Sequence, residues 1–191
     1  GTLTVYNYAN AITATLADTS TGNNNIRLET ISSGDINVDT ITAGTGIVTL
    51  DSAGAITGVD TSDDTVDITA SSLVVEAMTG FASAANTLDL DATSSNLTGS
   101  GNVYFDVVGT GGHSTTIDLS SGSIEIDGRS TADGGYEAIT LTNVDTDSGT
   151  LTVYNYANAI TATLADTSTG NGNIRLETIS SGDINVDTIT A

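Results

Sequence analysis

The sequence predicts an all-β protein, a right-handed parallel β-solenoid (β-helix) with coils of about 21 residues. Apolar and polar residues alternate along most of the chain, and short turn-forming clusters separate the alternating runs. Apolar residues at strand starts also recur at a nearly constant spacing, since Leu3, Ile26, Ile47, Ile68 and Leu88 stand 23, 21, 21 and 20 residues apart. We interpret each step as one coil of two or three strands, stacked on the coils before and after it.

The alternating runs have the pattern of half-buried strands, with β-branched and aliphatic side chains on the inward face. They cover residues 3–8, 25–29, 35–39, 66–69, 88–91, 117–119 and 124–127. The segment from Ser71 to Ala85 also has apolar residues three and four apart, which is a helical spacing. We favour strands there too, with Met78 and Phe81 filling a wider turn.

A small element recurs where strands begin, namely Gly or Asn, then any residue, then Leu, Ile or Val. Gly34-Asp35-Ile36, Gly101-Asn102-Val103 and Gly122-Ser123-Ile124 are examples. Because Gly and Asn tolerate a positive φ, this element predicts sharp corners between the strands.

The first 43 residues return as the last 43, with an offset of 148 and one difference, Asn24 against Gly172. We expect residues 1–148 to be one full repeat unit of about seven coils, and residues 149–191 to be the start of the next, near-identical unit. At about 4.8 Å per coil, such a unit would rise about 34 Å. No separate globular domain is expected, and the chain is interpreted as a window on a longer array.

The charge of the chain narrows the classes of partner. Three arginines and no lysine stand against 24 acidic residues, so the formal net charge is −21. Phosphate binding needs clustered cations, and we therefore expect no nucleic-acid partner.

No apolar run approaches the ~20 residues of a membrane span. Cysteine is absent, which excludes disulfides and thiolate metal sites.

Several runs of the chain resemble the filamentous-haemagglutinin type of bacterial β-solenoid, whose coils read G-x-I-x-L-x-S-x-G-x-I-x. The resemblance lies in residues 46–57, 66–73 and 84–88. It implies a very large secreted surface protein with an adhesive or matrix role, and it brings no catalytic residues with it. The two copies are more alike than the coils of such proteins, which favours a repetitive function that depends on length.

Two sets of side chains are candidates for binding. Asp60, Asp63, Asp64 and Asp67 lie within eight residues beside a turn, and carboxylate oxygens are the ligands that Ca²⁺ prefers. Calcium is the one cofactor that the sequence suggests, and a solvated acidic surface is the alternative. The second set is the tyrosines that recur in both copies, which could contact sugars or a neighbouring fibre, or could stack to stabilise the coils. These are Tyr6, Tyr8, Tyr154 and Tyr156.

We expect the chain not to be an enzyme. The carboxylate pairs of the sequence, such as Asp89 with Asp91, flank one strand and do not face each other across a cleft, as glycoside hydrolysis requires. His113 is the single histidine, and we expect it to be a bystander in a loop.

Together these features predict a structural extracellular fibre or adhesin stalk, secreted or at the cell surface. Its expected partners are neighbouring repeat units end to end, and lateral fibres or surface glycans. The alternatives are a carbohydrate-binding surface module of an adhesin and a polysaccharide-degrading β-helix enzyme.

Overall fold

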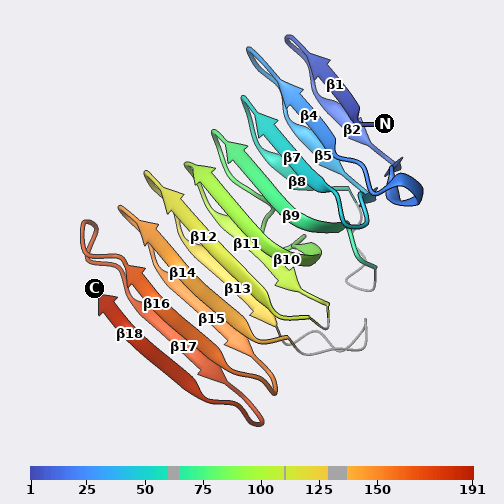
Figure 1. The fold of residues 1–191 in the computed structure, drawn as a ribbon. Helices are drawn as coiled ribbons and strands as arrows, with labels where there is room; N and C mark the ends of the chain where they lie inside the picture. Colours follow the sequence, from blue (N-terminus) through green and yellow to red (C-terminus); the bar gives the residue numbers. More distant parts are fainter. Residues whose placement is uncertain (60–64, 110, 129–136) are drawn as a thin grey trace.

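The computed structural model describes residues 1–59, 65–109, 111–128 and 137–191, and in them the chain forms a parallel β-solenoid of about eight turns (Figure 1). All pairs between its strands are parallel, which confirms the predicted fold class. The strands are β1 (Leu3–Asn7), β2 (Ile12–Ala14), β3 (Ala17–Asp18), β4 (Ile26–Thr30), β5 (Ile36–Val38), β6 (Ile41–Thr42), β7 (Ile47–Ser52), β8 (Ile56–Gly58), β9 (Ile68–Ala77), β10 (Leu88–Gly99), β11 (Val103–Val107), β12 (His113–Leu119), β13 (Ile124–Gly128), β14 (Ile139–Thr146), β15 (Leu151–Asn155), β16 (Ile160–Asp166), β17 (Ile174–Thr178) and β18 (Ile184–Thr190); a single 3₁₀ turn, η1, covers Ser20–Gly22.

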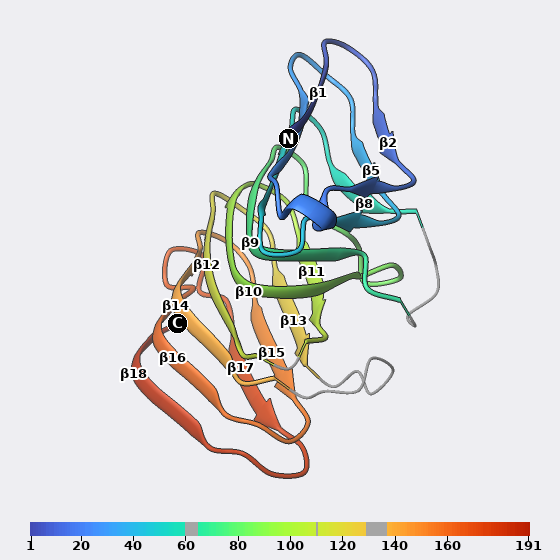
Figure 2. The ribbon, with the colours of Figure 1, turned by 45° about the vertical axis from the view of Figure 1, so that its right-hand side comes forward.

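Two long stacks of strands form the broad sides of the solenoid. Face A consists of β1, β4, β7, β9, β10, β12, β14, β16 and β18. Face B consists of β2, β5, β8, β11, β13, β15 and β17, with Phe81 bridging β8 and β11. A short third side, made by β3, β6 and the start of β9, gives the first turns a three-sided cross-section (Figure 2).

The core between the faces is built from apolar columns with one residue per turn, and two of these columns run the length of the molecule. On face A the column runs Val5, Leu28, Leu50, Val75, Leu97, Ile117, Val144, Ala165, Ile189. On face B it runs Ile12, Ile36, Ile56, Phe81, Val103, Ile124, Leu151, Ile174. Away from the two ends of the molecule these side chains are buried. Each turn thus buries its apolar residues only against the turns beside it.

A turn takes about 23 residues, slightly more than the expected 21. The third residue of the predicted series, Ile47, does not face the core. Val48 stacks on Ile26, whereas Ile47 points outward and is 40% exposed. Ile68 stacks on Ile41 on the short third side. The column of Ile26 and Val48 on face A continues with Leu73 instead. Because both residues of the pair Ile47-Val48 are apolar, alternation alone does not decide which one faces inward.

Residues 71–77 belong to strand β9, as favoured over a helix, and Phe81 is buried against Phe105 at 6.4 Å between ring centroids. The predicted corners are present as well. Gly34 has a φ of 113°, and a Cβ there would collide with the carbonyl of Asn10 in the turn before. Its copy, Gly182, has a φ of 118° and the same relation to Asn158.

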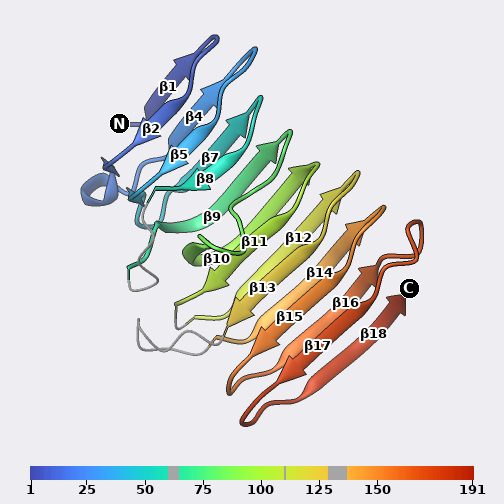
Figure 3. The same cartoon turned by 180° about the vertical axis from the view of Figure 1, so that it is seen from behind.

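The two copies of the 43-residue segment pair their strands in the same register. Leu3 lies opposite Ile26 as Leu151 lies opposite Ile174. However, the copies occupy different sides of the solenoid, because β1 belongs to face A and β15 to face B. The two strands run in opposite directions in Figure 1, and Figure 3 shows the same stacks from behind.

Candidate binding surfaces

The outward side of face A carries a column of acidic residues, which we call the acidic ladder. Each member lies directly opposite the next in the strand register, with Tyr6 before the first and Thr190 after the last. The ladder consists of the acidic residues Glu29, Asp51, Glu76, Asp118, Asp145 and Asp166, and Thr98 interrupts it between Glu76 and Asp118. Neighbouring strands lie about 4.8 Å apart, so carboxylates of like charge are stacked at close spacing.

The charges of the ladder act on one another most clearly at Asp145. Partial burial raises the pKa of Asp145, and the neighbouring charges of Asp166, Asp147 and Asp118 raise it further. In contrast, a hydrogen bond from Ser168 lowers the pKa of Asp166. Its copy Asp18 is bonded to Ser20 in the same way and its pKa is also lowered.

Arg27 of face A forms ion pairs with two residues of the acidic ladder. Its guanidinium donates to Glu29 at 2.7 Å on its own strand, and at 3.1 Å to Asp51 in the next turn. The copy, Arg175, bonds Glu177 and donates to the hydroxyl of Tyr154 at 3.2 Å, with its guanidinium carbon 5.1 Å from the centre of that ring. The same side chain therefore changes partners with its surroundings.

A second acidic column, which the sequence did not predict, is largely buried although its members alternate with core residues along their strands. Asp67, Asp89 and Asp106 occupy the same register in three successive turns, and each is at most 7% exposed. The backbone amide of Asp89 donates to Asp67 at 2.9 Å, and the hydroxyl of Thr87 donates to Asp106 at 3.3 Å. The column continues to Asp127. No signal in the sequence pointed to it, because the turns between these residues differ in length.

Of the four aspartates predicted to bind calcium, Asp60, Asp63 and Asp64 lie outside the described residues. Asp67 is described, and it belongs to the buried aspartate column, in which it is 6% exposed and accepts from the amide of Asp89. Within the described ranges, no group of three or more His, Cys, Asp or Glu side chains is arranged to hold a metal ion. The calcium site thus stays a prediction.

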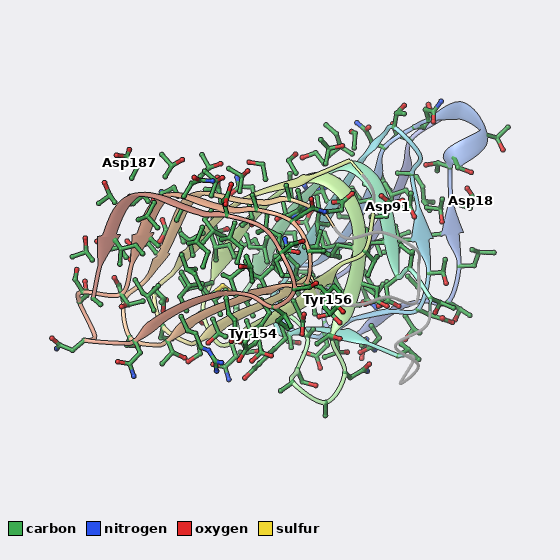
Figure 4. All side chains as sticks on the ribbon, turned by 90° about the horizontal axis from the view of Figure 1, so that it is seen from below. Asp18, Asp91, Tyr154, Tyr156 and Asp187 are labelled. Atoms are coloured by element: carbon green, nitrogen blue, oxygen red, sulfur yellow. The ribbon has the colours of Figure 1, made fainter. Side chains whose placement is uncertain are left out.

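The tyrosines lie on different parts of the surface. Tyr6 and Tyr8 at the first turn are 59% and 70% exposed, and Tyr156 is 37% exposed. Tyr154 is half-buried between Asp127 and Glu177 of the adjacent turns. Tyr154 and Tyr156 are seen in Figure 4, in which Asp18 and Asp187 mark the two ends of the molecule and Asp91 lies between them.

The expectation that His113 lies in a loop is wrong, because it begins strand β12 and is 1% exposed. Its Nδ1 donates to the carbonyl of Ala92 at 2.7 Å, so its Nε2 accepts from the hydroxyl of Ser95 at 2.9 Å. Ser95 in turn lies 2.7 Å from the hydroxyl of Thr115. Burial lowers the pKa of His113, which is therefore neutral at pH 7. A serine beside a histidine is the geometry of a nucleophile with its base, but this pair is closed inside the solenoid.

The apolar hollow beside Phe81 also lies inside the stack. It is lined by Val75, Leu97, Val103 and Leu119, among others, and has no room for a water molecule. Sites for small organic ligands usually measure ≈ 300–1,000 Å³ and carry a few polar groups. This hollow is therefore not a candidate binding site.

Comparison with known protein families, with curated proteins and with solved structures finds no match for this chain. The fold therefore defines the class of protein as a β-solenoid repeat protein. Among the described residues, none forms a helix long and apolar enough to cross a membrane.

Proposed function

We propose that the chain is a segment of an extracellular structural fibre or adhesin stalk, built from tandem β-solenoid units within a much larger secreted surface protein. One observation carries the proposal. Among the described residues, the strand Ile-Arg-Leu-Glu-Thr pairs on both sides as β4, with β1 and β7, and on one side as β17, with β15. The same sequence thus stacks into the solenoid in both copies and, as β4, supports a further turn.

The end of the solenoid supports the same conclusion. Four apolar side chains of the last turn, Ile179, Ile184, Val186 and Ile189, are 43–48% exposed. Their counterparts in the first copy are Ile31, Ile36, Val38 and Ile41, and the last three of these are fully buried under the next turn. An open edge with exposed apolar residues favours the addition of another strand. The occupant that fits best is a copy of residues 44 onward, which cover the same strands in the first unit.

In this function the stacked strands themselves carry the load. Backbone hydrogen bonds run from turn to turn along the rod axis, and the apolar columns fill the interior. The acidic ladder keeps rods soluble and apart, because the net charge of the chain is −21.

Hydrogen exchange of an extended chain tests the proposal. A copy of residues 44–109 is added after Ala191, and the amides of Ile174–Thr178 are compared with those of Ile26–Thr30. The two strands have the same sequence and hence the same intrinsic rates, and peptides that include Asn24 or Gly172 differ in mass. In the natural chain we expect β17 to exchange faster than β4, and in the extended chain as slowly as β4.

The matched control appends the same residues in scrambled order. Protection of β17 that is gained with the true copy and not with the scrambled one supports the array. If β17 exchanges equally fast in all three proteins, the second copy is not the start of a further unit and the fibre proposal fails.

A carbohydrate-binding surface module is the second candidate, favoured by the exposure of Tyr6 and Tyr8. Exposed aromatic rings of this kind can stack on sugars. A glycan array probed with the chain and with the Tyr6→Ala/Tyr8→Ala variant tests it. Signals that disappear in the variant support a glycan site, whereas identical profiles contradict it.

Calcium binding is tested in the same protein by thermal unfolding, in which Ca²⁺ would raise the midpoint of the unfolding transition and EDTA would reverse the effect.

A further inference from the structure

The duplicated segment does not return to the side of the solenoid from which it started. Six turns beyond Leu3 on face A lies Leu141, and one turn further lies Ala162. Leu151, the copy of Leu3, falls between these two in the chain. It lies on face B, in the column that begins at Ile12.

The copies share their registers, although residues 12–18 form two strands, β2 and β3, on two sides of the solenoid and the equivalent residues form the single strand β16. In both, the strand registers are identical, and the corner glycines Gly34 and Gly182 have φ values of 113° and 118°. Asn23 and Asn171 also share the left-handed conformation, with φ values of 49° and 53°. The change of face is therefore not a local distortion of one copy. It results from the length of the unit, because 148 residues at about 23 residues per turn make about six and a half turns.

We infer that in a tandem array of this unit, successive units are related by half a turn about the rod axis and present the same residues on opposite faces. The inference rests on the proposed array. One unit then advances the rod by about 31 Å, and a given face repeats only after two units, at about 62 Å.

This geometry gives the rod two equivalent sides. Tyr6 lies on face A opposite Glu29, whereas Tyr154 lies on face B opposite Glu177. Arg27 and Arg175 are divided between the faces in the same way. A partner that recognises residues of the repeat, whether a glycan or a second rod, meets them on both sides. The rod is therefore bivalent, because the same binding residues lie on both faces. It can join two partners through two copies of a single kind of binding site.

Cysteine pairs in the natural chain test the assignment of faces, which is possible because the chain has no cysteine of its own. Cα atoms of facing residues on adjacent strands lie about 4.8 Å apart, within the range that a disulfide spans. We expect Glu125→Cys/Thr152→Cys to cross-link on face B, and Asp118→Cys/Asp145→Cys to cross-link on face A. The crossed pair Asp145→Cys/Thr152→Cys is only seven residues apart in the chain, and we expect it to stay reduced.

Electron microscopy of a concatemer of three units tests the inference itself. A biotin acceptor peptide is inserted between Ser32 and Ser33, and at the equivalent turn of every unit, and is decorated with streptavidin. We expect particles on alternating sides of the rod, about 31 Å apart along its axis. A rod with every particle on one side overturns the inference and leaves the fibre proposal standing. Particles that form no rod at all contradict the fibre proposal.

Discussion

Polar side chains inside the solenoid are held by hydrogen bonds between successive turns. Ser95 bonds His113 and Thr115 in the next turn, and Ser52 donates to the carbonyl of Gly34 in the turn before at 3.2 Å. Buried polar groups are costly when they lose such partners. These residues therefore help to fix the register in which each turn stacks on the one before.

His113 makes the stability of the protein sensitive to acid. Burial lowers its pKa in the folded chain below the ordinary value of 6.5, so below that pH the unfolded chain binds a proton that the folded chain does not. The contribution of His113 is present in full above about pH 6.5 and is lost as the pH falls. We predict that His113→Gln, measured by urea unfolding at several pH values, reduces the loss of stability between about pH 7.5 and 5.5. Parallel curves for the two proteins would show that His113 is not buried as a neutral ring.

Asp145 predicts an effect of the opposite sign. Its pKa is raised in the folded chain, so its charged form is disfavoured there, and stability increases as the pH falls through the raised pKa toward the ordinary value. Asp145→Asn should stabilise the protein at pH 7 by a few tenths of a kcal/mol, as for a like-charge pair between strands, and less in high salt. Asp187→Asn, at the open end of the solenoid, is the control. A destabilised Asp145→Asn protein would contradict the repulsion within the ladder.

At the scale of the element, strand existence and corner positions could be predicted from the sequence, whereas the register of distant turns could not. Alternation identified β4 and β13, because each has one buried face, and β1, whose inward residues are half-buried. The columns depend on the number of residues in every turn, and this number varies along face A. Leu97 and the residue stacked on it, Ile117, are 20 residues apart in the chain, whereas Ile117 and Val144 are 27 apart. The buried aspartates and the acidic ladder depend on this register, and the sequence alone therefore did not predict them.

The same glycine-to-alanine substitution can be tested in an interior turn, at Gly34, and in the last turn, at Gly182. We predict that Gly34→Ala costs about 1–3 kcal/mol, because φ is positive there and the new Cβ meets the carbonyl of Asn10. Gly182→Ala meets the equivalent carbonyl of Asn158, but it lies in the exposed last turn, which can open locally. Its measured cost in global unfolding should therefore be smaller. Equal costs would show that the last turn is as tightly coupled as the interior, and a neutral Gly34→Ala would contradict the corner geometry.

At the scale of the whole molecule, the described turns stack into one rod. A single hydrophobic cluster runs through them from the first turns to the last. In such a protein each unit contributes its own stability and one interface to its neighbour. Stability and length should both grow with the number of units, which is the behaviour of a fibre and not of a compact binding domain.

The most direct measurement is the length of concatemers of one, two and three units by small-angle X-ray scattering. We predict that each added 148-residue unit lengthens the particle by about 31 Å at a constant cross-section. Particles whose cross-section grows with each unit, or whose length does not increase by a constant step, would contradict a continuous solenoid.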